Sequence, residues 1–202
     1  MDGLELPLES GTVRLKVLSE GGRIDLNGAA PVLLSGLYQA AGSGALNPEE
    51  FAALVLDWRD RNSNPRAQGA EAPEYSGKGL AYGPRNGPFL SLEDMLLMPG
   101  MTDEDFDLLM PYLTVFNPIG EIDPASAEIP VMMAVPDMTE KEASDIKEIF
   151  DNPESSRRDL NQAIRPYGRY FTSTGTDVFR VIVEARLNNG YVKSVEAVLM
   201  AG

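Results

Sequence analysis

The stretch VFRVIVEARLNNGYVKSVEAVLM, residues 178–200, predicts a β-hairpin. Two kinds of side chain alternate through residues 178–187, as they do in a strand whose two faces meet different surroundings. The triplet Asn-Asn-Gly at 188–190 is a strong hairpin turn, because Asn and Gly accept the left-handed backbone of a tight turn. Residues 191–200 then supply the antiparallel partner strand.

A second extended region lies near the other end of the sequence. Apolar side chains alternate with polar ones at residues 13–17, which is typical of a half-buried strand. The residues at 20–22, Glu-Gly-Gly, have the chemistry of a turn, and residues 23–27 resume an extended alternation. We therefore expect residues 11–27 to form a hairpin of their own.

Between these strands the sequence is helical, with repeated helix-start signals. Asn47, Thr102 and Thr139 each stand where a side-chain oxygen can cap the first turn of a helix. Glu142, three residues after Thr139, completes a capping box, and Ser91 starts a shorter helix. Strands at both ends with helices between them predict one sheet domain interrupted by a helical insertion.

Three local expectations complete this outline. Residues 62–89 hold four prolines and several glycines, which predicts a long irregular loop. Residues 155–167 predict one more helix, because their apolar side chains share one face. Trp58 ends an apolar helical face and is expected to be an anchor of the core.

A short turn recurs within the helical region. Residues 98–102 read MPGMT and residues 135–139 read VPDMT, so the unit of helix, tight apolar turn and helix repeats at an offset of 37 residues. Turns of this kind can hold nucleic-acid phosphates on backbone amides, which makes a helix-hairpin-helix nucleic-acid-binding protein the alternative function. The acids at 103–105 and the Asp137 that replaces glycine argue against phosphate binding.

Composition removes several classes of function. The 202 residues include neither cysteine nor histidine, so disulfides, thiolate metal sites and nucleophile–histidine pairs are ruled out. A formal net charge of −14 disfavours nucleic acid and suits cations or basic partners. No apolar run reaches the roughly 18 residues of a membrane span, and no catalytic motif is present. An enzyme is not expected, although a calcium-dependent extracellular enzyme remains a third class to test.

Oxygen-bearing side chains follow one of the predicted helices directly. Asp60, Asn62 and Asn64 have the one-three-five spacing with which a turning loop wraps a hard cation. Glu71 and Glu74 add two carboxylates, and calcium takes six to eight oxygen ligands. The sixth position holds proline where an EF-hand loop has glycine, so a solvated acidic loop is the competing interpretation.

A series of short motifs occurs in order along the chain: Gly22-Arg23-Ile24-Asp25-Leu26-Asn27, Asp57-Trp58-Arg59-Asp60, Gly69-Ala70-Glu71, Tyr75, Asn86-Gly87-Pro88, Ser91-Leu92-Glu93-Asp94, Pro99-Gly100-Met101 and Pro111-Tyr112-Leu113-Thr114-Val115. This series resembles the general secretion pathway protein K family, the large minor pseudopilins of bacterial type II secretion systems. The resemblance runs from about residue 11 to residue 200.

The resemblance implies an α+β fold, in which a pilin-like antiparallel sheet domain carries a large inserted α-helical domain with helix-hairpin-helix-like repeats. On this basis residues 1–28 and 155–202 form the pilin-like domain, and residues 29–154 form the inserted α-domain. The family's hydrophobic N-terminal transmembrane helix is absent from this sequence. The resemblance therefore implies a single-pass protein of the bacterial inner membrane, with this part in the periplasm.

The resemblance also implies a function. The chain is expected to be a structural minor pseudopilin, not an enzyme, that caps or initiates the pseudopilus tip and supports protein export across the outer membrane. Its implied partners are minor pseudopilins I and J, with the secreted substrate or the outer-membrane channel as further candidates. No nucleic acid is expected, and the membrane is contacted only through the N-terminal helix.

A calcium site in the α-domain is implied as well, with one or two ions. The positions that fit the ligands are Asp60, Asn62, Asn64, Glu71 and Glu74. Many relatives carry a further acid directly after Gly-Ala-Glu, where this chain has Ala72.

Overall fold

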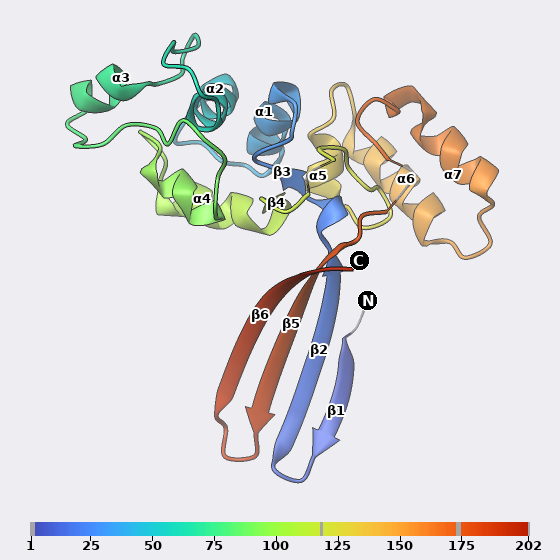
Figure 1. Cartoon of the computed structure of the whole chain (residues 1–202). Helices are drawn as coiled ribbons and strands as arrows, with labels where there is room; N and C mark the ends of the chain where they lie inside the picture. Colours follow the sequence, from blue (N-terminus) through green and yellow to red (C-terminus); the bar gives the residue numbers. More distant parts are fainter. Residues whose placement is uncertain (1–2, 118, 173–174, 202) are drawn as a thin grey trace.

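The computed structural model describes residues 3–117, 119–172 and 175–201. A four-stranded antiparallel sheet projects from one side of a helical part, as Figure 1 shows. The strand order is β1-β2-β5-β6, with β1 at Leu4–Leu8, β2 at Gly11–Ser19, β5 at Val178–Leu187 and β6 at Val192–Met200. The predicted hairpin of residues 178–200 is confirmed, with Gly190 at a φ of +88° in its turn.

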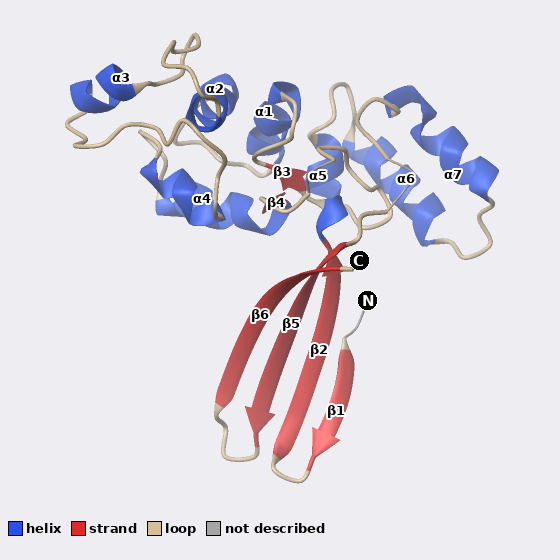
Figure 2. Ribbon diagram, in the orientation of Figure 1, coloured by secondary structure: helices blue, strands red, loops and turns tan. Residues whose placement is uncertain are grey.

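All helices of the described residues lie between β2 and β5 in the sequence, in a part that we call the head, residues 20–177 (Figure 2). Its α-helices are α1 Pro31–Ala40, α2 Pro48–Arg59, α3 Ala72–Gly77, α4 Asp103–Leu109, α5 Ile129–Met133, α6 Glu140–Asp151 and α7 Arg157–Ile164. Short 3-10 helices are η1 Glu20–Gly22, η2 Leu92–Leu97, η3 Met110–Tyr112 and η4 Arg165–Tyr167. A two-stranded parallel sheet joins β3 Ile24–Asp25 to β4 Leu113–Thr114.

The expected hairpin of residues 11–27 is wrong. β2 pairs with β1 on one side and β5 on the other, whereas β3 pairs with β4 inside the head. The chain leaves the sheet at η1, where Gly21 accepts a hydrogen bond from the Asp123 amide at 2.8 Å. A Cβ on Gly22 would lie 2.4 Å from the Ser126 carbonyl oxygen, so glycine is required where the chain passes this backbone. The strand β1 was not predicted.

The helix-start predictions are confirmed. The Asn47 side chain caps α2, Thr102 caps α4, and Thr139 forms a reciprocal capping box with Glu142 at α6. The segment after Ser91 is helical but adopts the tighter 3-10 form. The predicted loop of residues 62–89 is interrupted by the short helix α3, which the sequence pattern does not predict.

The two related turns have the same backbone geometry. Met101 donates an amide hydrogen bond to the Met98 carbonyl at 3.2 Å, and Met138 donates one to Val135 at 3.2 Å. Gly100 has a φ of +92°, and Asp137 adopts a φ of +62° at the equivalent position. The turn therefore recurs in space, while a full helix-hairpin-helix repeat stays a prediction.

The core lies almost entirely in the head. Among the described residues, Val178 is the one buried apolar side chain of the four-stranded sheet, and it is not part of the core cluster in the head. Helix α1 packs on α2 and α5, and α6 packs on α5 and α7. The sheet is therefore a single layer with two open faces, and a layer of this kind is stable only when an apolar face is covered. The domain limits at residues 28 and 155 remain predictions.

Candidate functional site

The first candidate site lies at the end of the head where α2 runs into the loop before α3. Asp57 is fully buried there, although it is acidic and lies among the apolar side chains of α2. Its carboxylate accepts hydrogen bonds from the Arg66 amide at 3.1 Å and from the Arg66 guanidinium at 2.5 Å. A Cβ on Gly69 would lie 1.9 Å from Asp57 Oδ2, so only glycine fits at this position.

Glu71 is the least satisfied group of this site. Its residue is 1% exposed, and its side chain faces the Glu74 amide in the capping box of α3 without a regular hydrogen bond to either carboxylate oxygen among the described residues. Burial raises the pKa of Glu71, and the negative charges of Asp57, Asp60 and Glu74 raise it further. A buried carboxylate without donors is costly, and a bound cation would remove that cost.

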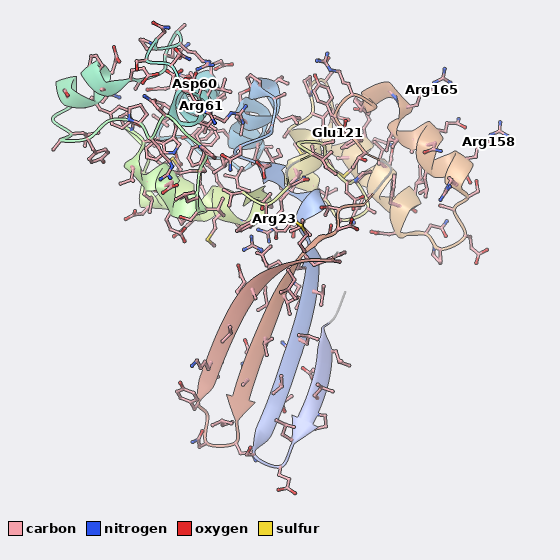
Figure 3. All side chains as sticks on the ribbon, viewed as in Figure 1. Arg23, Asp60, Arg61, Glu121, Arg158 and Arg165 are labelled. Carbon is pink, nitrogen blue, oxygen red and sulfur yellow. The ribbon has the colours of Figure 1, made fainter. Side chains whose placement is uncertain are left out.

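The predicted one-three-five loop folds back on itself. Asp60 Oδ1 accepts the Asn62 amide at 3.0 Å, and Asn62 Oδ1 accepts the Asn64 amide at 2.8 Å. Burial raises the pKa of Asp60, but the Arg66 guanidinium and the Asn62 hydrogen bonds together outweigh burial and hold the pKa below its usual range. Figure 3 shows Asp60 on this outer end of the head, beside Arg61.

The structure thus brings part of the predicted ligand set together. Asp60 and Glu71 lie close enough for their charges to interact, and Glu74 Oε2 accepts the Glu71 amide at 2.9 Å. The side chains of Asn62 and Asn64 are exposed. In the part of the chain that the structure describes, no three acidic side chains are arranged to hold a metal ion. The five-residue ligand set and the calcium ion stay predictions.

Asp57 lies at this site although it is not a member of the predicted ligand set. The signal that could have found it is a carboxylate on the apolar face of α2, followed by a glycine just before the predicted ligand Glu71. The prediction for Trp58 is confirmed, because its ring is 3% exposed and stacks on Phe89 at 5.5 Å between centroids.

A second cluster joins the head to the sheet, and we call it the neck cluster: Glu20, Arg23, Thr114, Arg180 and Glu196. The Glu20 carboxylate is fully buried and accepts hydrogen bonds from Arg180 Nε at 2.7 Å and Nη2 at 3.1 Å. Thr114 donates its hydroxyl hydrogen to the same carboxylate, and Arg180 also pairs with Glu196. Figure 3 shows Arg23 at this junction.

The two faces of the sheet have opposite character. Residues that are paired across neighbouring strands lie on the same face of the sheet. One face carries a row that crosses all four strands: Leu4, Leu15, Val183 and Val195. We call this the apolar face; it also carries Leu6, Leu8, Val13, Val17, Val181, Ala185, Ala197 and Leu199. Leu4, Val17 and Val195 are 58%, 50% and 55% exposed, which is unusual for large apolar side chains gathered in one patch.

The other face carries charged rows such as Glu5, Arg14 and Glu184. We call it the polar face. None of the helices in the described part of the chain has the length and apolar character of a membrane span.

Comparisons with known proteins agree with this architecture. The family model for the type II secretion system (T2SS), protein K, matches residues 15–118. A chain in the crystal structure of the GspK–GspI–GspJ complex, from the type 2 secretion system of enterotoxigenic Escherichia coli, aligns with a TM-score of 0.73 at 14% identity. The alignment covers 100% of this chain and 79% of that chain, and at this identity it shows a shared fold. No curated protein sequence matches the chain.

Proposed function

We propose that this chain, which belongs to the type II secretion system protein K family, is a minor pseudopilin that caps or initiates the pseudopilus tip and so supports protein export across the outer membrane. The observation that carries the proposal is the exposed apolar face of a single-layer sheet. Such a face suits an assembly subunit, because apolar helical surfaces of neighbouring subunits would cover it.

The head gives a physical reason for a position at the tip. Pilin-type filaments grow by heterologous contacts, which continue until one end is blocked. The helices of the head stand across one end of the sheet, as Figure 1 shows, and they would occupy the space of a further subunit above. The partners we propose are minor pseudopilins I and J, with the secreted substrate and the outer-membrane channel as later contacts.

The proposed location is the periplasm, with anchoring in the inner membrane by an N-terminal helix of the family type. The proposed role is structural rather than enzymatic. The alternative, a helix-hairpin-helix nucleic-acid-binding protein, has the recurring turn in its favour and the acids after that turn against it. Tight, salt-sensitive binding of labelled duplex DNA would favour the alternative.

The assembly proposal is tested by mixing the purified chain with its cognate minor pseudopilins I and J and measuring the mass of the complex by light scattering after size exclusion. We expect a ternary complex that Val195→Glu disrupts, because it buries a charge in the apolar face. Val192→Glu is the matched control on the same strand, since it faces Arg186 on the polar face. No complex with the unmodified chain would reject the proposal.

Calcium is the second part of the proposal. The buried Glu71 carboxylate, which has only the capping-box contact with the Glu74 amide, supports a cation site at Asp60, Asn62, Asn64, Glu71 and Glu74, to which we add Asp57. A bound calcium ion would supply positive charge to these oxygens and tie the loop of residues 60–71 to α2 and α3.

Isothermal titration tests the calcium site. We expect calcium uptake that is lost in Glu71→Gln and retained in Glu154→Gln, which changes an exposed acid elsewhere in the head. No uptake by the unmodified chain at millimolar calcium would exclude the site.

A further inference from the structure

A groove with a volume of about 430 Å³ lies where the head meets the polar face of the sheet. We call it the junction groove. Its head side is formed by Leu90, Met110 and Phe116, and its sheet side by Ile182 and Glu196. Because Ile182 and Glu196 are paired on the polar face, the groove and the apolar face are on opposite sides of the sheet. A subunit that covers the apolar face therefore leaves the groove open.

The wall of the groove exposes large apolar side chains. Leu90 is 62% exposed, Met110 is 42% exposed and Phe116 is 43% exposed. These residues come from separate segments of the head and meet at a concave surface. Apolar side chains gathered around a hollow are typical of protein–protein contacts, where a buried anchor contributes most of the affinity.

The two arginines at the groove, Arg23 and Arg180, already have hydrogen-bond acceptors within the protein. Arg180 donates to Glu20 at 2.7 Å and also pairs with Glu196, while Arg23 donates to the Leu113 carbonyl at 3.3 Å. Their side chains are only 12% and 16% exposed. Neither guanidinium is therefore free to attract an acidic ligand.

The rim is left with negative charge. Glu93 is exposed, and a hydrogen bond from the Ser91 hydroxyl holds the pKa of the Glu93 carboxyl below its usual range. The Glu196 side chain is 47% exposed, and its carboxylate pairs with Arg180 through Oε1. The chain as a whole carries a formal net charge of −14, so nucleic acid and anionic lipid are disfavoured as occupants.

We propose that the junction groove is a docking site for a segment of a partner subunit that inserts an apolar side chain and places lysine or arginine against Glu93 and Glu196. The segment bridges the head and the sheet, so it recognises only a chain in which both parts are folded and joined. This inference rests on the proposed function, because the partner it names is a minor pseudopilin of the same tip.

The test compares two double variants of the full chain in their affinity for the purified cognate I–J pair. Leu90→Glu with Met110→Glu places two charges in the groove, and we expect at least a tenfold loss of affinity. Val32→Glu with Leu97→Glu is the matched control, since these side chains are 39% and 42% exposed and lie outside the groove. Equal thermal midpoints of the two variants show that both are folded.

A rim variant gives an independent measurement. Glu93→Lys should weaken binding severalfold at low salt and less at high salt, as a screened charge contact does. If the unmodified chain binds and the groove double variant binds equally well, the groove is not the docking site, while the proposed function stands. If the unmodified chain does not bind the I–J pair at all, the proposed function fails and this inference fails with it.

Discussion

Replacing Glu20 with alanine should destabilise the chain more than any surface substitution. The change removes the buried carboxylate that two nitrogens of Arg180 contact at 2.7 and 3.1 Å. It also deprives the buried Thr114 hydroxyl of its acceptor. Breaking a buried ion pair on one side costs about 3–5 kcal/mol, because the remaining charge stays buried and unpaired. We expect a loss near the lower end of that range, since Arg180 keeps Glu196 as a partner.

Urea unfolding followed by circular dichroism measures this loss, and a double-mutant cycle assigns it to the pair. Arg180→Ala should cost much less in the Glu20→Ala background than alone, with a coupling energy of about 1–3 kcal/mol. Arg186→Ala is the control on the same strand, where a side chain that is 67% exposed should change stability by less than about 0.5 kcal/mol. A Glu20→Ala cost below about 1 kcal/mol, or strictly additive substitutions, would refute the account of the neck cluster.

The same pair predicts a pH dependence. Burial raises the pKa of Glu20, but its bonds to Arg180 and Thr114 outweigh burial and lower the pKa below the ordinary value of 4.5. A carboxyl whose pKa is lowered by folding stabilises the fold above its unfolded pKa and loses that contribution as the pH falls through the folded pKa. The stability difference between the unmodified chain and Glu20→Ala should therefore be constant near pH 7 and shrink below about pH 4.5.

Three further predictions concern the head. Gly69→Ala should lower the free energy of unfolding in urea by about 1–3 kcal/mol, because the new Cβ would overlap the Asp57 carboxylate. Gly77→Ala is the control, since its Cβ meets nothing within 4 Å, and it should be neutral or mildly stabilising. Equal effects of the two variants would contradict the close approach at Gly69. Burial raises the pKa of Glu71, so with a chelator present the unmodified chain should lose stability as the pH rises above 4.5 and the buried carboxyl ionises. Glu71→Gln removes that charge and should raise the thermal midpoint at pH 7. A lower midpoint would contradict a buried charge that lacks compensation. Tyr38→Phe should lower the free energy of unfolding, measured by urea denaturation, by about 1–3 kcal/mol. The reason is that Asp105 loses the phenol donor and the Leu46 amide loses its acceptor. An unchanged free energy would show that water replaces both hydrogen bonds.

Local signals in the sequence were enough to predict much of this fold. The Asn-Asn-Gly turn, the Asn47 cap and the Thr139 capping box depend on neighbouring residues alone, and all three are present in the structure. Strand partners depend on distant residues, so the alternation at residues 23–27 was assigned to the wrong partner. The strand at Leu4–Leu8 was missed although its leucines alternate with polar and proline positions.

The candidate sites also combine residues that local sequence identifies with residues that only the fold brings together. Spacing pointed to Asp60, Asn62 and Asn64, with Glu71 and Glu74 as carboxylates close to them in sequence. Spacing could not identify Asp57, whose role appears only when Gly69 brings the loop back against α2. The neck cluster could not be predicted either, because Glu20 and Arg180 meet only when β2 and β5 pair.

That pairing of β2 with β5 also fixes an order of events during folding. The two strands are separated in sequence by the entire head, and contacts of such high sequence separation form late because loop-closure entropy must first be overcome. The head has its own core and can consolidate earlier, while the four-stranded sheet is complete only when β5 and β6 have joined β1 and β2. A chain that lacks β5 and β6 would therefore present only the part of the apolar face that β1 and β2 carry. A binding surface that spans all four strands is in this way complete only in a chain whose first and last strands have paired.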